Sequence, residues 1–159
     1  MYICKRLQYC NDYKFILIMN LAVHQYLQKF NIKPSVQRMA IMEFLMKHHI
    51  HPTADDIYNA LYKVIPTLSK TTVYNTLKLF AEQDAVQVLT LDEKNVRFDI
   101  DMSSHAHFQC IQCGKVFDIP LEDPYILRLK EIGNLKVLES HLYYKGYCNE
   151  CKEKEKRWE

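Results

Sequence analysis

Two cysteine pairs constrain the fold of this 159-residue chain more than any other feature. Cys110 and Cys113 form one C-x-x-C pair, and Cys148 and Cys151 form a second pair after 34 intervening residues. Two such pairs suit the tetrahedral thiolate cage that Zn²⁺ prefers, because a tight turn lets both sulfurs of a pair reach one ion. All four positions of that cage are then filled, so the sequence predicts a structural rather than a catalytic zinc. The alternatives are four buried free thiols or redox-active pairs.

The rest of the composition favours a reducing compartment. Cys4 and Cys10 are isolated, and the longest early apolar run, residues 15–19, is far too short to span a membrane. Apolar residues make up 48 % and charged residues 25 % of the chain, as is ordinary for a globular protein. We therefore expect a cytoplasmic protein with thiolates on a metal.

The net charge of the chain is only +2, so any nucleic-acid footprint must come from local clustering of basic residues and from dimerisation.

The first 18 residues match no recognisable motif, and Met19 precedes an amphipathic segment. Two interpretations stay open. Either the natural protein starts at Met19 and residues 1–18 are an extension with a non-native start, or these residues form an additional helix that packs on the domain.

The first half of the chain has the apolar periodicity of helices. Pro34-Ser35 signals the start of one of them, and Thr53 with Asp56 forms a capping box for the next. Ser69 caps the last helix, whose apolar face carries Val73, Leu77 and Phe80. The predicted helices span about residues 21–30, 36–47, 54–65 and 70–83.

The period then changes to that of strands. Apolar residues alternate over residues 86–90 and 96–100, on either side of a turn composition at residues 92–95. Helices followed by a two-stranded hairpin are the order of a winged helix-turn-helix, with the helix at 70–83 as the candidate for the major groove.

A second, small unit follows. Residues 106–111 and 115–119 have the pattern of short strands around Cys113. A helix is predicted from Asp123 to Glu131, ended by Gly133, and a further strand at residues 137–144. The sequence therefore predicts an α+β fold.

A set of histidines and aspartates forms a second group of potential metal ligands. His105 and His107 point to the same face of a strand, Asp99 and Asp118 flank them, and His51 precedes a predicted helix. A mixed nitrogen and oxygen shell suits Fe²⁺ or Mn²⁺ better than a thiolate site does. Spacing alone leaves open that His51 is a helix cap or part of a polar loop, and that Asp99 pairs with a nearby basic side chain.

Five motifs between about residue 20 and residue 151 are specific in combination. They are HPTADDIY at 51–58, TTVYNTL at 71–77, RFD at 97–99, HAHFQCIQCGK at 105–115 and GYCNEC at 146–151. Together they resemble the ferric uptake regulator (Fur) family, and more closely its peroxide-sensing branch, the PerR-type repressors.

This resemblance implies a winged-helix DNA-binding domain at residues 19–97 and an α/β dimerisation and metal-binding domain at 98–151, followed by a charged tail at 152–159. It implies a homodimer that binds double-stranded operator DNA and is not an enzyme. Each subunit would carry a structural Zn²⁺ on the four cysteines and a regulatory Fe²⁺ or Mn²⁺. The regulatory ligands would be His51, Asp99, His105, His107 and Asp118.

The resemblance also implies a sensing chemistry. Peroxide would react with bound Fe²⁺ and the oxidant would modify His51 or His105, so that the metal is lost and the DNA released. Mn²⁺ would not support this reaction. Asp118 favours the peroxide branch, since iron-uptake members tend to carry glutamate there, and Asn75 does so because they tend to carry arginine. Neutral drift in an iron-uptake regulator would give the same pattern, so that function is the alternative.

On DNA, we expect the helix at 70–83 to read base edges with its exposed face, while basic side chains hold phosphates. The hairpin tip at Lys94 is a further candidate for a backbone contact. The candidates are Thr71, Thr72, Tyr74 and Asn75 for the bases, and Arg38, Lys70 and Lys78 for the phosphates.

Two more distant functions compete with a repressor. A metalloenzyme would use the histidine and aspartate ion as a catalyst, but the sequence has no Gly-rich phosphate loop and no nearby Glu or Lys base motif. A zinc-stapled protein-interaction module would bind no operator in any metal state.

Overall fold

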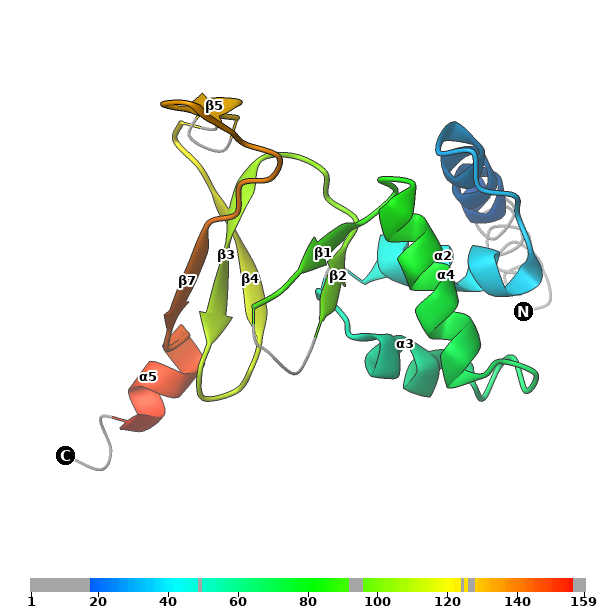
Figure 1. The fold of residues 1–159 in the computed structure, drawn as a ribbon. Coiled ribbons are helices and arrows are strands. Elements are labelled where there is room, and N and C mark those ends of the chain that lie inside the picture. Colours follow the sequence, from blue (N-terminus) through cyan, green and yellow to red (C-terminus); the bar gives the residue numbers. More distant parts are fainter. Residues whose placement is uncertain (1–17, 49, 92–95, 124, 126–127, 156–159) are drawn as a thin grey trace, which may run out of the picture. The chain divides into compact units, whose positions relative to one another are not determined.

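The computed structural model describes residues 18–48, 50–91, 96–123, 125 and 128–155, and it divides into two compact units, Met1–Asp101 and Met102–Glu159 (Figure 1). Residues 1–17 of the predicted extension at 1–18 and the hairpin tip at 92–95, including Lys94, lie outside the described residues. Within the part of the chain that the structure describes, every helix is too short or too polar to cross a lipid bilayer.

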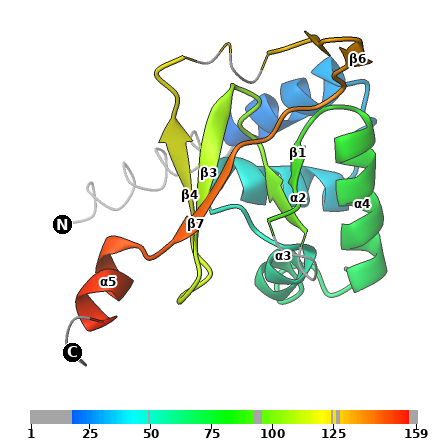
Figure 2. The same ribbon diagram turned by 60° about the vertical axis from the view of Figure 1, so that its left-hand side comes forward.

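The first unit consists of helices followed by a two-stranded hairpin. A helix at residues 18–29 precedes α2 (Val36–Lys47), α3 (Ala54–Leu61) and α4 (Lys70–Glu82). Strands β1 (Gln87–Leu89) and β2 (Arg97–Asp99) pair antiparallel, with Val88 opposite Phe98. Figure 2 shows α4 beside α2 and α3. The predicted order of helices and hairpin is confirmed.

Side-chain caps define where these helices begin. The Ser35 hydroxyl accepts the Arg38 N–H at 3.3 Å, and the Ser69 hydroxyl accepts the Thr72 N–H at 3.0 Å. At α3, Thr53 accepts the Asp56 N–H at 3.1 Å and donates its own N–H to the Asp56 carboxylate at 2.9 Å. Each cap satisfies N–H groups that the first helical turn leaves without a carbonyl partner.

The capping box at α3 gives a testable stability effect. Thr53→Ala removes the hydroxyl that accepts the Asp56 N–H and that donates to the Asp56 carboxylate at 2.7 Å, so we expect the free energy of unfolding of the first unit to fall by about 1 kcal/mol. The measurement is urea unfolding followed by circular dichroism. Thr67→Ala, in an exposed turn of the same unit, is the matched control and should change stability by less than about 0.5 kcal/mol. Equal effects of the two substitutions would contradict the cap.

The core of the first unit comes from the inward faces of its helices. Val73, Leu77 and Phe80 on α4 are fully buried, as predicted. They pack with residues of the other helices and of the hairpin, since spacing by three and four residues places apolar side chains on one face. The other core residues are Val23, Leu27, Ile32, Ile41, Met42, Leu45, Ile57, Leu68, Ala85, Val86 and Phe98.

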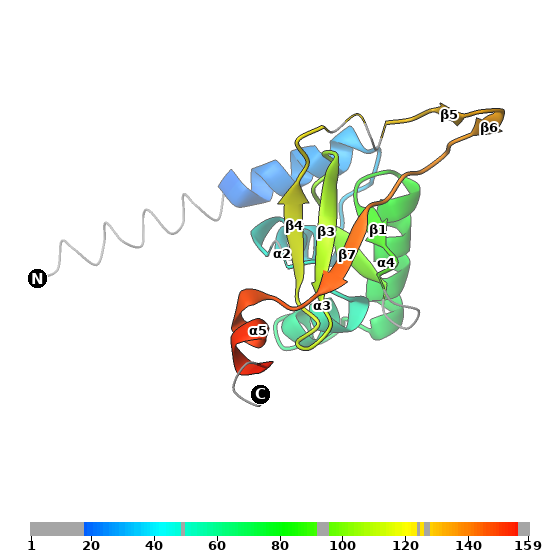
Figure 3. The same cartoon turned by 90° about the vertical axis from the view of Figure 1, so that its left-hand side faces the viewer.

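The second unit is built on a three-stranded sheet in the order β4-β3-β7 (Figure 3). Strand β3 (His105–Cys110) pairs antiparallel with β4 (Val116–Pro120) and parallel with β7 (Tyr143–Gly146). Helix α5 (Asn149–Glu155) follows β7. The strands predicted at 106–111 and 115–119 are confirmed within a residue.

The helix predicted from Asp123 to Glu131 is reduced to one short 3₁₀ turn among its described residues: the Asp123 carboxylate accepts the Tyr125 N–H at 3.0 Å, and the Arg128 N–H donates to the Tyr125 carbonyl at 2.9 Å. Arg128 and Leu129 are not helical, and Glu131 begins β5 (Glu131–Ile132), which pairs with β6 (Leu135–Lys136). Gly133, at φ +60°, lies in the two-residue turn that joins these strands, so a local hairpin begins where the predicted helix was expected to end. Residues 124, 126 and 127 lie outside the described residues. The strand predicted at 137–144 is shorter and later, since β7 begins at Tyr143.

Candidate metal centres and nucleic-acid interface

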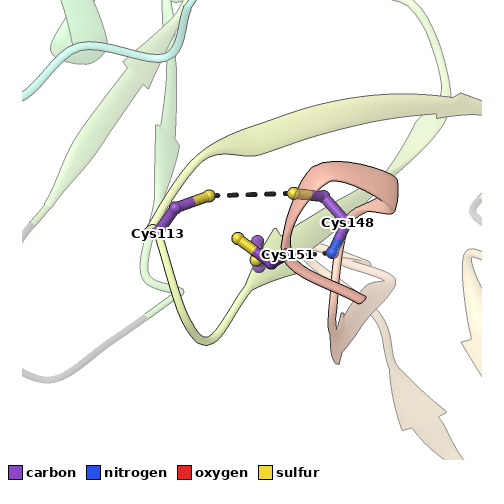
Figure 4. A group of neighbouring side chains, drawn as sticks. Cys113, Cys148 and Cys151 are labelled. Atoms are coloured by element: carbon purple, nitrogen blue, oxygen red, sulfur yellow. Dashed lines mark hydrogen bonds between the residues drawn. The ribbon is translucent and has the colours of Figure 1, made fainter. Parts of the chain in front are cut away.

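The four cysteines of the two pairs converge in the second unit. One sulfur from each lies within 4.8 Å of the others. Cys110 ends β3 and Cys113 lies in the following turn, whereas Cys148 directly precedes α5 and Cys151 lies in its first turn. The parallel pairing of β3 with β7 brings the pairs together, because it places Cys110 opposite Gly146, two residues before Cys148. Figure 4 shows Cys113, Cys148 and Cys151 turned toward one another.

The spacing of the sulfurs fits a shared ion rather than a disulfide. The Cys113 and Cys148 sulfur atoms are 3.9 Å apart. Sulfurs bound at about 2.3 Å to one tetrahedral Zn²⁺ would lie about 3.8 Å apart. Gly114, at φ +71°, makes the turn that returns the chain to β4. The cluster therefore fits a structural zinc site.

The thiols of this cluster differ in acidity. Backbone N–H groups lower the pKa of Cys110 to about 6. The largest contribution comes from the Cys148 N–H, which lies 3.4 Å from the Cys110 sulfur. Burial raises the pKa of Cys151 to about 12. At neutral pH an ion would find Cys110 ionised and would displace the proton of Cys151, since only thiolates are good metal ligands.

His51 and Asp99 form a pair of potential ligands in the first unit. Two residues of β2 hold the backbone of the segment before α3. The Phe98 N–H donates to the Pro52 carbonyl at 3.0 Å, and the Arg97 guanidinium donates to the His51 carbonyl at 3.0 Å. His51 Nε2 then lies 3.6 Å from Asp99 Oδ2, with both side chains buried. His51 has a left-handed φ of +49°, a conformation that is uncommon outside glycine and concentrates at functional sites.

His105, His107 and Asp118 form a second group of potential ligands, in the second unit. His105 and His107 lie on one face of β3, and Asp118 lies opposite His107 on β4. The Nε2 atoms of the two histidines are 3.0 Å apart, and Asp118 Oδ1 lies 3.4 Å from His105 Nε2 and 3.8 Å from His107 Nε2. Two imidazoles and one carboxylate are the ligand set of many non-haem Fe²⁺ sites.

The backbone fixes the tautomer of His105. Its Nδ1 lies 3.0 Å from the Ser103 carbonyl oxygen. A carbonyl only accepts, so Nδ1 carries the proton and the lone pair of Nε2 faces His107 and Asp118. Metal-binding histidines are commonly oriented in this way by a partner behind the ring. The five predicted ligands thus fall into two groups, one in each unit, and each group fits a metal by its donor chemistry.

The group in the second unit predicts a large effect on metal affinity. Asp118→Asn removes the carboxylate of the three-residue set, so we expect Mn²⁺ binding to weaken at least about tenfold. Competition with a fluorescent chelator measures this affinity. Glu122→Gln, an exposed carboxylate of the same unit, is the matched control and should leave the affinity unchanged. Unchanged affinity in Asp118→Asn would exclude this carboxylate as a ligand.

The predicted DNA-reading residues lie on the outer face of α4. Thr71, Tyr74 and Asn75 are exposed, Tyr74 to 59 %, and Thr72 is partly buried. Lys70 and Lys78 are exposed as well, but each pairs with a carboxylate: Lys70 with Asp55 at 2.6 Å and Lys78 with Glu82 at 3.7 Å. Phosphates would compete with these carboxylates for the lysines.

The sequence alone does not indicate the roles of Arg97 and Lys33. Arg97 belongs to the RFD motif, and in the structure its contact with the His51 carbonyl helps to place a potential metal ligand. Lys33 lines a hollow that also includes Arg38, Thr72 and Asn75. The only signal in the sequence was its place directly before Pro34-Ser35, where a helix begins.

Known proteins resemble this chain over most of its length. The sequence model of the Ferric uptake regulator family matches residues 29–144. A peroxide operon regulator of Bacillus subtilis is 39 % identical over 131 residues, which are 81 % of this chain and 90 % of that protein. A peroxide-responsive repressor, PerR, of Staphylococcus epidermidis is 36 % identical over 129 residues, 80 % of this chain and 86 % of that protein.

A solved structure shares the fold. The ferric uptake regulator of Helicobacter pylori, described as revealing three functional metal-binding sites, aligns with a TM-score of 0.65 at 20 % identity. The alignment covers 84 % of this chain and 91 % of that one. With its winged-helix order, its four-cysteine cluster and these matches, the chain belongs to the ferric uptake regulator family.

Proposed function

We propose that the protein is a metal-dependent transcriptional repressor that senses peroxide. It acts as a homodimer on double-stranded operator DNA in the cytoplasm and is not an enzyme. The observation that carries the proposal is the mixed nitrogen and oxygen donor set, divided between the unit that contains the reading helix and the unit that contains the cysteine cluster. The names of relatives at 36 % and 39 % identity support the peroxide signal.

In this proposal, one ion per subunit is held by both groups of ligands. His51 and Asp99 contribute from the first unit, and His105, His107 and Asp118 from the second. Five ligands leave one position of an octahedral shell for a small molecule. Binding by both groups would favour one arrangement of the units, and a hundredfold gain in operator affinity requires only about 2.7 kcal/mol of coupling between metal and DNA.

In this proposal, the histidine rings serve both as metal ligands and as the groups that peroxide oxidises. Fe²⁺, when bound there, supplies the redox chemistry with peroxide that Mn²⁺ lacks. The net change inserts one oxygen atom of H₂O₂ into the ring of His51 or His105 and releases water. An oxidised ring is a poorer ligand, so the metal is lost, the coupling to DNA disappears and the repressor dissociates.

The second unit is the proposed site of the structural zinc and of dimerisation. Four thiolates would hold the Zn²⁺ and join β3 to α5. A second copy of the chain would cover large apolar side chains that this unit exposes, as obligate dimer interfaces do. These side chains are Ile111, Phe117, Ile119, Tyr125, Leu129, Ile132, Leu135, Leu138, Tyr144 and Tyr147.

The reading helix is α4. Its exposed side chains would contact base edges in the major groove, while Val73, Leu77 and Phe80 hold it to the core. The proposed contacts are Thr71, Thr72, Tyr74 and Asn75 to bases, and Arg38, Lys70 and Lys78 to phosphates.

Mass spectrometry of the ligand histidines tests the sensing chemistry. After aerobic loading with Fe²⁺ and a low dose of peroxide, peptides that contain His51 or His105 should gain the mass of one oxygen. Protein loaded with Mn²⁺ is the first control and should gain no oxygen. His141 is the second control: it lies in the same unit as His105 but outside the ligand set, and it should stay unmodified. Oxidation spread evenly over all histidines would contradict ligand-directed chemistry.

An iron-uptake regulator, or a regulator of another metal's uptake, is the alternative. The same donor set would then hold the metal as a corepressor with no response to peroxide, and the shared fold with the Helicobacter pylori regulator suits this function equally. Peroxide sensitivity of DNA binding separates the two functions.

A further inference from the structure

A row of ring side chains begins among the proposed metal ligands of the second unit and continues beyond them. The rings of His105 and His107 on β3 have centres 4.5 Å apart. Tyr143 on β7 comes next, with its ring centre 5.9 Å from that of His107. The His141 ring follows, 5.7 Å from the Tyr143 ring and within 13° of parallel to it. Tyr143 and His141 are not among the five proposed ligands, so the row raises the question of what they contribute.

Strand pairing places the Tyr143 ring beside His107. In the central strand, His107 lies opposite Asp118 of β4 and opposite Tyr143 of β7. Residues directly opposite each other on neighbouring strands have their side chains on the same face of the sheet. The His107 N–H also donates to the Leu142 carbonyl at 3.0 Å, which fixes the register of β7 at this point. The His107 ring is thus flanked by a potential ligand on one side and by an aromatic side chain on the other.

The two side chains that flank His107 differ in their exposure to solvent. The Asp118 side chain is 41 % exposed, so an ion can reach the site past β4. Tyr143 is partly buried, and its hydroxyl oxygen is closed to solvent. The ring of Tyr143 is held in turn by the stacked His141, whose Nε2 lies 3.3 Å from a Glu139 carboxylate oxygen. Tyr143 therefore covers the β7 side of the His107 ring and leaves the β4 side open.

We propose that Tyr143 is a positioning residue for the metal site, a role that rests on the metal binding of the proposed function. The torsion that turns a histidine ring has broad minima, so strand pairing alone leaves the direction of the His107 Nε2 atom loosely defined. For His105, the Ser103 carbonyl fixes the ring through Nδ1. For His107, packing against Tyr143 keeps Nε2 turned toward His105 and Asp118. Groups that orient a metal ligand from behind influence metal affinity nearly as strongly as the ligands do.

Mn²⁺ affinity of the full-length protein, measured by competition with a fluorescent chelator, tests this role. Tyr143→Leu removes the ring but keeps an apolar side chain, and should weaken Mn²⁺ binding about threefold to tenfold, the usual worth of an aromatic contact. Tyr143→Phe keeps the ring and should bind as the wild type does. Phe108→Leu is the matched control, because it removes a ring from the opposite face of the same strand pair, where Phe108 packs against Phe117. It should lower the melting temperature and leave the affinity unchanged.

A double-mutant cycle separates positioning of His107 from a general structural role. In a His107→Ala background, Tyr143→Leu should cause no further loss of affinity, because the ring that Tyr143 orients is absent. An equal loss with and without His107 would show that Tyr143 acts through the fold instead, and would overturn the proposal.

The other outcomes distinguish this proposal from the proposed function. If the wild type binds Mn²⁺ and Tyr143→Leu binds it as tightly, the positioning role is wrong and the metal-dependent function stands. An equal loss of affinity in Phe108→Leu, or in Tyr143→Phe, also contradicts packing of the Tyr143 ring as the cause. If the wild type binds no Mn²⁺ outside the cysteine cluster, both proposals fail.

Discussion

Low concentrations of peroxide are expected to release the Fe²⁺-loaded protein from its operator and to leave the Mn²⁺-loaded protein bound. The reason is the placement of the proposed ligand histidines: His105 Nε2 faces His107 and Asp118, and His51 Nε2 faces Asp99, so both rings would lie at the ion. Loss of the ion removes the coupling between metal and DNA. We expect the operator affinity to fall at least about a hundredfold, which corresponds to about 2.7 kcal/mol.

Fluorescence anisotropy with a duplex selected on the Mn²⁺ form measures this loss. Fe²⁺-loaded protein kept without oxygen and without peroxide is the control, and it should bind like the Mn²⁺ form. If both metal forms keep the DNA after peroxide, the protein is a metal corepressor and the peroxide function is wrong. If both lose it equally, the oxidation is not directed by iron.

Cys110→Ser is expected to abolish zinc binding and to unfold the second unit. The buried apolar residues of that unit are few among those described: Ala106, Val116 and two of the cysteines themselves. A domain with so small a core depends on a metal or a disulfide. Binding of structural Zn²⁺ supplies about 10–16 kcal/mol in small zinc domains, as much as a whole domain's usual stability of about 5–15 kcal/mol.

Zinc content by atomic absorption and dimerisation by ultracentrifugation measure the effect. Cys110→Ser should contain no zinc and should not dimerise, because the exposed apolar side chains proposed for the interface belong to the unit that unfolds. Cys10→Ser, outside the four-cysteine set, is the matched control and should keep both properties. A folded, zinc-free dimer of Cys110→Ser would show that the cluster is dispensable for the fold.

The features predicted best were those in which residue spacing itself determines geometry. The C-x-x-C spacing required one turn per pair, and the structure brings all four sulfurs together. The alternation of His105 and His107 placed both on one face of β3, and the capping signals at Ser35, Thr53 and Ser69 located three helix starts.

The features that escaped prediction depend on contacts between distant segments. The Asp123-Pro124 start signal and Gly133 as a stop favoured a helix at 123–131, but Arg128 and Leu129 are not helical and Gly133 forms the turn between β5 and β6. The Arg97 contact that holds His51 joins residues 46 positions apart. The hollow at Lys33 and Arg38 exists only because α2 and α4 pack together, and no periodicity of either helix indicates it.

The central claim is that one metal ion is shared by His51 and Asp99 from the DNA-reading unit and by His105, His107 and Asp118 from the other unit. A crystal structure of the Mn²⁺-loaded protein, with anomalous diffraction data that locate manganese, tests it most directly. The account predicts one manganese peak per subunit outside the cysteine cluster, with all five side chains within bonding distance. A manganese bound by His105, His107 and Asp118 while His51 points elsewhere would contradict it.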